Sequence, residues 1–333
     1  MEQNNNPIAF NSQAEVLLAE GLKKSYGPRK ALQGLSFSLK AGRVLGFLGP
    51  NGAGKTTSIR ILTTMLEPEE GHFVVDGTGS EFPEKIRRKI GVLPENLGFP
   101  KQMTGIEYLV YFGRLYGRNK EDAKRYGLKL LEEVGMQQRG KSLIGSYSHG
   151  MRQRIGIARA LVNDPVVVFL DEPTLGLDPR GQQELLTLVQ QIARERGTGV
   201  VLCSHLLSEI EGVCDDVVIL SSGQIVAQGP VKEVVGQAQQ NVLRVRVPPP
   251  SIEQAQDILR ALSQVKKVTP TGQMGGWLGV ELADEDQVPP DNYQGKNKIL
   301  EALTHANIPV LGFEAEGGRL QDVFLQLTEE AIK

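Results

Sequence analysis

Brief apolar runs alternate with longer amphipathic segments between residues 15 and 229. The runs are too short for helices and predict buried strands, at residues 44–48, 166–170, 199–203 and 217–220. The segments between them carry apolar residues at helical spacing, at residues 55–66, 106–116, 121–134, 152–161 and 182–195. Strands that alternate with helices predict an α/β domain with a mostly parallel sheet covered on both faces.

Two stretches depart from this alternation. From residue 99 the pattern is almost purely helical, which predicts a helical subdomain, over about residues 99–160, inserted between strands of the sheet. After residue 237 the pattern of apolar and polar residues changes. Residues 242–247 alternate apolar and polar positions as a half-buried strand does, and helical and strand-like patterns follow. We therefore expect a disordered N-terminal tail at residues 1–14, a main domain at 15–237 and a small C-terminal α+β domain at 238–333.

The composition narrows the classes of protein to which this chain can belong. Of its 333 residues, 40% are hydrophobic and 23% are charged, which excludes wholesale disorder. The net charge of −2 counts against a protein that holds nucleic acid over its whole surface, so we expect no nucleic-acid partner. No apolar run approaches the roughly 18 residues that span a bilayer. The two cysteines cannot make a disulfide framework. The Asn-rich start of the sequence lacks the apolar run of a signal peptide. We expect a cytoplasmic protein that does not itself cross the membrane.

A glycine-rich loop follows the first apolar run. Residues 49–56 match the pattern G-x-x-x-x-G-K-[ST] between a predicted strand and a predicted helix. Such a loop turns consecutive N–H groups toward phosphate oxygens, and the helix start adds positive potential. In this interpretation Lys55 contacts the β- and γ-phosphates of a nucleoside triphosphate and the Thr56 hydroxyl ligates Mg²⁺. The other nucleotide contacts that we expect from this loop are Asn51, Gly52, Ala53, Gly54 and Thr57.

Two adjacent carboxylates end the apolar run at residues 166–170. Asp171 and Glu172 repel each other at the end of a strand unless a cation or a proton intervenes. A Mg²⁺ held by Asp171, directly or through water, would supply that charge, and Glu172 would polarise the water that attacks the terminal phosphate. A polar turn before Pro173 would explain the same two residues, and it is the phosphate loop upstream that favours the catalytic interpretation.

Further segments resemble motifs of one known family, the ATP-binding cassette (ABC) proteins. Residues 146–154, Ser-Tyr-Ser-His-Gly-Met-Arg-Gln-Arg, resemble the family's signature motif, whose usual form is Leu-Ser-Gly-Gly-Gln. Tyr26-Gly27 resembles the aromatic loop, residues 90–95 stand in the place of the Gln loop, residues 175–178 resemble the loop after the acid pair, and Ser204-His205 resembles the switch histidine. The motifs follow one another in the family's order, so that together they are far more specific than any one of them.

The resemblance implies a P-loop nucleotide-hydrolase cassette that binds ATP and Mg²⁺. In this family two cassettes face each other head to tail, and each ATP lies between the phosphate loop of one copy and the signature motif of the other. It implies that Ser148, His149 and Gly150 contact the ATP of the opposite copy. Asp178, in the loop after the acid pair, is a further nucleotide-binding candidate.

Two aromatic side chains receive roles from the same resemblance. Tyr26 would stack on adenine, and His205 would contact the γ-phosphate and hold Glu172 and the water in register. Each has a structural alternative: Tyr26 as a core tyrosine, and His205 as a strand-end histidine that caps the next helix.

The chain departs from the family pattern at three positions. His149 stands where the family usually has Gly, and Met151 where it usually has Gln. A side chain at position 149 is tolerated if backbone N–H groups do the binding and the position needs no positive φ. Glu95 replaces the usual Gln, and a carboxylate 4 Å from the γ-phosphate is repelled by about 4 kcal/mol in a surface-like dielectric. Our hypothesis is that Glu95 approaches the metal, which makes Thr56, Glu95 and Asp171 the expected metal ligands.

The expected function is that of the ATPase subunit of a membrane exporter whose spanning permease is encoded separately. The chain resembles the drug- and polysaccharide-exporter branch of the family, so we expect it at the cytoplasmic face of the membrane, bound to the permease. Leu97, Phe99 and Pro100 are the candidates for the groove that accepts a permease helix. A non-transport cassette, acting as a regulatory module or on ribosomes or nucleic acid, is the alternative, although such proteins usually carry two phosphate loops.

Overall fold

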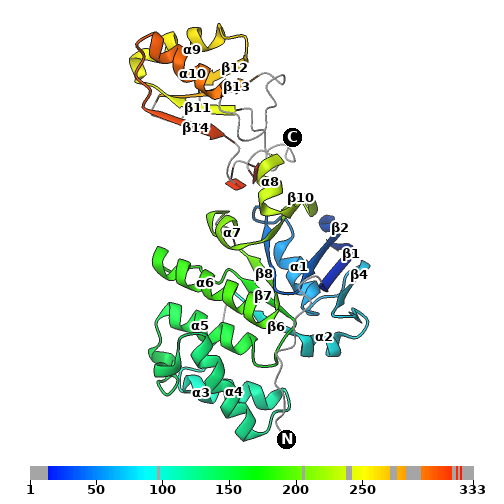
Figure 1. Cartoon of the computed structure of the whole chain (residues 1–333). Helices are drawn as coiled ribbons and strands as arrows, with labels where there is room; N and C mark the ends of the chain where they lie inside the picture. Colours follow the sequence, from blue (N-terminus) through cyan, green and yellow to red (C-terminus); the bar gives the residue numbers. More distant parts are fainter. Residues whose placement is uncertain are drawn as a thin grey trace, which may run out of the picture. The chain divides into compact units, whose positions relative to one another are not determined.

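The computed structural model describes residues 14–95, 98–204, 207–237, 242–270, 276–282, 294–316, 320–321 and 323–324. The chain divides into two compact units, one of residues 1–231 with 327–333 and one of residues 232–326, and each is described by itself (Figure 1). The predicted disordered tail lies outside the described residues except for Ala14. Among the described residues, no helix combines the length and the apolar character that crossing a membrane requires.

The first unit is built on a six-stranded sheet in the order β10-β9-β3-β8-β7-β6. Its parallel strands are β3 (Val44–Leu48), β6 (Ile90–Leu93), β7 (Val167–Asp171), β8 (Gly199–Cys203) and β9 (Asp216–Ser221), and β10 (Gln224–Pro230) runs antiparallel to β9. Every residue of β3 and β8 is buried, because central strands of a sheet that is covered on both faces have no side in solvent. The predicted α/β class with a mostly parallel sheet is confirmed.

A second, antiparallel sheet shares the core of this unit. Its strands, in order, are β2 (Arg29–Lys40), β1 (Glu15–Tyr26), β4 (Glu70–Val75) and β5 (Thr78–Gly79). The predicted strands did not include this sheet, although β2 has the alternation of a half-buried strand, with Leu35, Phe37 and Leu39 buried and the residues between them exposed. The rings of Phe37 in β2 and Phe47 in β3 lie 5.4 Å apart in the common core.

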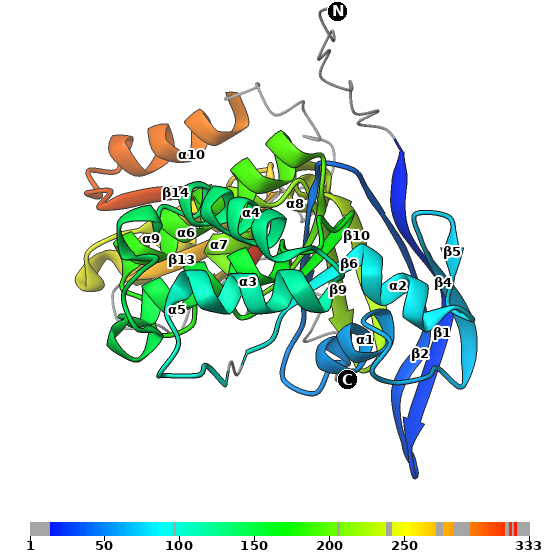
Figure 2. The ribbon, with the colours of Figure 1, turned by 90° about the horizontal axis from the view of Figure 1, so that it is seen from below.

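The helices of the first unit form two groups. Outside the helical insertion lie α1 (Lys55–Leu62), α2 (Pro83–Lys89), α6 (Pro179–Arg196) and α7 (Leu207–Val213). The insertion consists of α3 (Gly105–Leu115), α4 (Lys120–Glu133) and α5 (His149–Ala160), with 3₁₀ turns at Gln137–Arg139 and Ile144–Ser146. It lies on one side of the parallel sheet and the antiparallel sheet lies on the other (Figure 1 and Figure 2).

One arginine joins the helical insertion to the parallel sheet. Arg196, in the last turn of α6, donates to Glu133 of α4 at 2.6 Å, to Asp164 before β7 at 2.9 Å and to the Tyr126 hydroxyl at 3.0 Å. Burial alone would lower the pKa of Arg196, but its hydrogen bonds with Tyr126 and Glu133 outweigh burial and raise the pKa. The insertion is therefore held by a hydrogen-bonded charge network as well as by apolar packing.

The second unit has a separate sheet and a separate core. After α8 (Val231–Gln237), which begins at the division between the units, come β11 (Val242–Arg246), α9 (Ile252–Arg260), β12 (Val265–Pro270), β13 (Trp277–Leu282), α10 (Gln294–His305) and β14 (Gly312–Glu316). The strands pair antiparallel in the order β12-β13-β11-β14, which is the split βαβ arrangement of ferredoxin-like folds. Leu243, Val280 and Leu303 lie at the centre of its core. The predicted α+β class of the C-terminal part is confirmed.

Candidate functional site

The loop between β3 and α1 is shaped by glycines that no larger residue can replace. Gly54, the residue before α1, has a φ of 112°, and a Cβ there would lie 2.7 Å from the carbonyl oxygen of Ala31. A Cβ on Gly49 would lie 2.6 Å from the carbonyl oxygen of Leu220. No side chain caps the first turn of α1, so its leading N–H groups are left for an external acceptor such as a phosphate.

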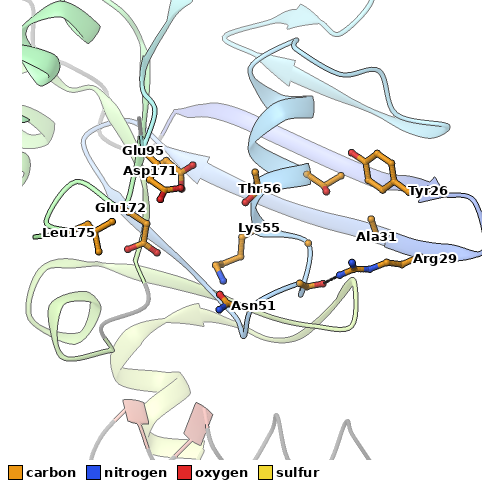
Figure 3. Close-up of a pocket in the computed structure, with 13 residues that line it drawn as sticks. Tyr26, Arg29, Ala31, Asn51, Lys55, Thr56, Glu95, Asp171, Glu172 and Leu175 are labelled. Carbon is orange, nitrogen blue, oxygen red and sulfur yellow. Dashed lines mark hydrogen bonds between the residues drawn. The ribbon is translucent and has the colours of Figure 1, made fainter. Parts of the chain in front are cut away.

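Lys55, the first residue of α1, folds back over this loop. Its ammonium group donates to the carbonyl oxygens of Gly49 at 2.5 Å and Pro50 at 3.2 Å. Lys55 lines a cavity of about 510 Å³, and the rest of the lining is Tyr26, Arg29, Ala31, Asn51, Gly52, Gly54, Thr56, Thr57, Glu95, Asp171, Glu172 and Leu175 (Figure 3). The structure thus brings the predicted loop residues and the acid pair to one cavity, whereas Ala53 is buried in the apolar core.

Three carboxylates meet at one wall of this cavity. Asp171 ends β7, Glu172 follows it, and Glu95 comes shortly after the neighbouring parallel strand β6. Figure 3 shows the Glu95 and Asp171 side chains next to each other. Burial, followed by the negative charges of Glu172 and Glu95, raises the pKa of Asp171, and the positive charge of Lys55 opposes that shift. Clustered carboxylates of this kind are stabilised by a cation.

These residues fit a divalent cation that arrives with a nucleotide. Among the described residues, no group of three or more His, Cys, Asp or Glu side chains is placed to hold a metal ion by itself. Mg²⁺ in nucleotide sites takes only one or two protein carboxylates, and phosphate oxygens and water complete its shell. The carboxylates of Asp171 and Glu95 and the exposed Thr56 hydroxyl offer oxygen ligands of the type that Mg²⁺ prefers.

Glu172 is held in an unfavourable backbone conformation. Its φ of 49° lies in the left-handed region, which costs a residue other than glycine about 1–2 kcal/mol. Two backbone bonds maintain it: the Glu172 N–H donates to the Cys203 carbonyl at 2.9 Å, and the Glu172 carbonyl accepts from the Leu175 N–H at 3.2 Å. The side chain lines the cavity on the wall that faces Lys55 (Figure 3). Backbone strain is concentrated at functional sites, so it supports a role for this carboxylate.

His205, the predicted switch histidine, lies outside the described residues. Ser204 before it is buried at the end of β8, and its hydroxyl donates to Glu209 of α7 at 2.8 Å. The same carboxylate oxygen accepts from the Thr174 hydroxyl at 2.8 Å. Glu209, which is 6% exposed, therefore connects the segment after the acid pair with the segment that leads to His205. The motif pattern did not predict Glu209, and nothing in its spacing marks it as a partner of both segments.

The antiparallel sheet supplies another wall of the cavity. Tyr26 ends β1 and is 47% exposed, so the alternative of a core tyrosine is wrong. Arg29 begins β2, and its guanidinium donates to the carbonyl oxygen of Gly52 in the phosphate loop at 3.1 Å (Figure 3). The motif pattern also missed Arg29. A cation close behind the aromatic loop was the signal that could have found it.

The signature segment lies outside this cavity in the single chain. Ser148 is the N-cap of α5, where its hydroxyl accepts from the Met151 N–H at 3.3 Å. Ser148 and His149 are exposed, Gly150 is half-buried, and none of the three lines the cavity. Asp178 does not line it either, and its carboxylate caps the start of α6 by accepting from the Gly181 N–H.

A phosphate loop with its lysine, an acidic wall and an exposed aromatic ring define the class of this protein as a P-loop nucleotide-binding cassette. A family model described as ABC transporter matches residues 32–175. The linearmycin resistance ATP-binding protein LnrL of Bacillus subtilis is 32% identical over 96% of this chain and 100% of its own length. The chain belongs to the family of ABC transporter ATP-binding proteins, and the predicted resemblance is confirmed.

Another relative and two solved structures agree with this class. The daunorubicin/doxorubicin resistance ATP-binding protein DrrA of Streptomyces peucetius is 34% identical over 92% of this chain and 91% of its own. The structure of an ATP-binding subunit of an ABC transporter matches at 30% identity and a TM-score of 0.60, over 67% of this chain and 92% of its own. A dimeric bacterial ABC transporter cassette has the same fold at 24% identity and a TM-score of 0.59, over 65% of this chain and 98% of its own.

Proposed function

We propose that this chain binds and hydrolyses ATP with Mg²⁺, and that ATP-driven pairing of two copies powers a separately encoded membrane permease. Family membership implies an ATPase, and coupling to transport is the further step that we propose. One observation carries the assignment: a single cavity holds Lys55 of the phosphate loop opposite the carboxylates of Glu95, Asp171 and Glu172.

We assign the residues of the cavity to three roles: phosphate binding, metal binding and proton transfer. Lys55 and the N–H groups at the start of α1 hold the β- and γ-phosphates. Mg²⁺, when bound, supplies positive charge at the phosphate oxygens, and Thr56, Asp171 and Glu95 are its protein ligands. Glu172 accepts the proton of the water that attacks the γ-phosphate, a contribution of about 10²–10⁴-fold.

The exposed ring of Tyr26 stacks on the adenine, and His205 contacts the γ-phosphate and keeps Glu172 and the attacking water in register. An exposed aromatic ring at the rim of a nucleotide cavity supports the first role. The second role follows from the family resemblance, and His205 comes directly after Ser204, which follows β8.

We further propose that two copies pair head to tail around two ATP molecules. Ser148, His149 and Gly150 begin a helix outside the cavity, so only a second chain can bring them to the nucleotide. A hydroxyl and the N–H groups of a helix start suit a phosphate, and Asp178 would lie near the same seam. A dimeric cassette of the same fold supports this assembly. Hydrolysis then removes the charge contacts that hold the seam together.

The direction of transport that we propose is export. Relatives that align along most of the chain are named for resistance to linearmycin and to daunorubicin and doxorubicin, and export of the compound would explain how a transporter subunit confers such resistance. The chain would then act at the cytoplasmic face of the membrane, bound to the permease, with no nucleic-acid partner. Among the described candidates for the permease groove, Phe99 packs with its ring centroid 5.7 Å from that of Tyr108.

The decisive experiment compares the full-length chain with its Glu172→Gln variant. We expect Glu172→Gln to lower the turnover number for ATP by about 10²–10⁴-fold. With saturating MgATP the variant should accumulate as a dimer in light scattering, and with ADP it should not. Glu132→Gln, a change at an exposed glutamate of α4, is the matched control and should behave as the wild type. A Glu172→Gln chain that stays monomeric with MgATP, even beside its permease, would contradict the proposal.

A further inference from the structure

His149 makes a contact that its place in the signature segment does not require. Its ring nitrogen Nε2 lies 2.7 Å from the carbonyl oxygen of Leu175. A carbonyl oxygen only accepts hydrogen bonds, so Nε2 carries the proton and donates it. The ring also lies over Gly176, because a Cβ there would come within 3.5 Å of Nε2. The histidine is thereby directed toward the loop that follows the acid pair in its own chain.

The accepting carbonyl belongs to the wall of the nucleotide cavity. Leu175 lines that cavity, and its N–H donates to the carbonyl oxygen of Glu172 at 3.2 Å. The loop also lies close to the start of α5, since a Cβ added to Gly150 would lie 3.5 Å from the side chain of Leu177. A continuous path of two hydrogen bonds therefore leads from His149 through Leu175 to the backbone of Glu172.

Glu172 is the residue that needs such support. Its left-handed φ of 49° persists only if neighbouring bonds maintain it. The Leu175 N–H supplies one of those bonds. With Gly at position 149, as the family usually has, the Leu175 carbonyl would lose its side-chain partner, and the turn would keep only its backbone bonds.

We propose that His149 is a positioning residue for the Glu172 of its own chain, holding the Leu175 carbonyl and with it the turn that aims the catalytic carboxylate. This role rests on the proposed function of Glu172. It differs from the contact expected of the signature segment, which serves the ATP of the opposite copy. One side chain thus connects the surface that meets the partner with the chemistry of its own site.

Two amide variants of His149 test whether the hydrogen bond from Nε2 to Leu175 is required. The amide nitrogen of His149→Gln can occupy the place of Nε2, whereas that of His149→Asn corresponds to Nδ1 and falls short of Leu175. We expect His149→Asn to lower the turnover number about fivefold, the effect of one lost hydrogen bond, and His149→Gln to restore most of it. His72→Asn is the control, because His72 lies 3.0 Å from Glu20 on the antiparallel sheet, away from this loop. Equal turnover for His149→Asn, His149→Gln and wild type would overturn the proposal.

Mixed dimers of full-length chains assign the effect to one copy. In the first arrangement, one copy carries Glu172→Gln and the other carries His149→Asn. Only one site can then turn over, the one that uses the intact Glu172 of the His149→Asn copy. The signature segment at that site comes from the other copy, whose His149 is intact. We expect this site to be slowed about fivefold. With both substitutions in the same copy, the remaining active site should turn over normally. An unaffected rate in the first arrangement would mean that His149 serves only the opposite nucleotide, which overturns the proposal.

Amide exchange of the nucleotide-free full chain gives a readout that needs no turnover. The segment at residues 174–178 should exchange faster in His149→Asn than in wild type, and His149→Gln should reverse most of the change. Unchanged exchange in this segment would overturn the role of His149. By contrast, undiminished ATP turnover in Glu172→Gln would overturn the proposed function itself, so the two failures are distinguishable.

Discussion

The phosphate-loop side of the cassette, around residues 49–56, and the signature side, around residues 148–150, differ in how far their residues are arranged for a nucleotide within one chain. On the first side, glycines packed against backbone carbonyls shape a loop, Lys55 lies over it and three carboxylates face it across a cavity. On the second side, Ser148 and His149 stand exposed at the start of a helix, and neither lines the cavity. The residues of the first side meet within one chain, whereas those of the second reach a nucleotide only if a second chain pairs with the first, as we propose. In that proposal, binding by one copy and hydrolysis by two are separable steps.

The largest effect is expected on the phosphate-loop side, for Lys55→Ala. In the proposed function, this change removes the cation that faces the developing charge on the γ-phosphate. We expect kcat/KM for ATP to fall by about 10²–10³-fold, the usual result of losing one preorganised charge-stabilising donor. Steady-state ATPase assays measure it, with Lys141→Ala on the exposed surface as the control. A loss of less than tenfold would show that this side is not the catalytic half.

Removal of the Tyr26 ring tests the adenine end of the same side. Stacking of a base on one aromatic ring is worth about 1–3 kcal/mol, so Tyr26→Ala should weaken ATP binding by that amount. Tyr26→Phe keeps the ring and should bind as the wild type does. Titration calorimetry with a non-hydrolysable ATP analogue measures both. Equal affinities for Tyr26→Ala and Tyr26→Phe would rule out stacking.

The substitution Glu95→Gln restores the residue that the family usually has and tests whether Glu95 contributes to Mg²⁺ binding. If Glu95 supports the Mg²⁺ shell, Glu95→Gln should raise the Mg²⁺ concentration for half-maximal turnover about tenfold, as the loss of an outer partner of a metal typically does. Titrations of Mg²⁺ at constant free ATP measure the shift. Identical metal dependence and turnover in the variant would contradict the hypothesis.

On the signature side, Ser148→Ala should spare binding and impair pairing. The loss of an N-cap costs about 1 kcal/mol, which corresponds to about a fivefold effect on an equilibrium that depends on this helix start. We expect unchanged ATP affinity of the single chain and about fivefold weaker dimerisation with MgATP in the Glu172→Gln background. A loss of ATP affinity in the monomer would erase the distinction between the two sides.

The smallest effect concerns the pH dependence of stability. Burial and the charges of Glu172 and Glu95 raise the pKa of Asp171, so the folded chain binds this proton more tightly than the unfolded chain does. Between the ordinary and the raised pKa, the stability of the nucleotide-free chain should therefore fall as the pH rises. Thermal unfolding across that range measures the slope, and Asp171→Asn should flatten it. An equal slope in the variant would assign the dependence to other groups.

Much of the cassette could be predicted from its sequence, because its parallel strands are short, apolar runs. The runs at residues 44–48 and 199–203 became β3 and β8 with identical limits. The antiparallel sheet was not predicted: β1 has register shifts and no regular period of two, whereas the alternation of Leu35, Phe37 and Leu39 in β2 was a signal that could have revealed it.

The candidate site was predictable where motif and chemistry coincide along the chain. Lys55 and the acid pair fall in local patterns, and the structure brings them to one cavity. Glu209 and the partner of His149 were not predictable in the same way, because each acts through a contact with a segment distant in sequence. Such contacts depend on tertiary structure, and a single sequence carries no local sign of them.

The close approach of Gly54 to Ala31 and of Gly49 to Leu220 limits how this site can be reused. Residues 49–56 do not constitute a portable module, since the oxygens that leave no room for a larger side chain belong to β2 and β9. A design that grafts these eight residues onto a new scaffold must therefore include the two strand segments as well. A deletion in either strand should abolish nucleotide binding, although the motif itself stays intact.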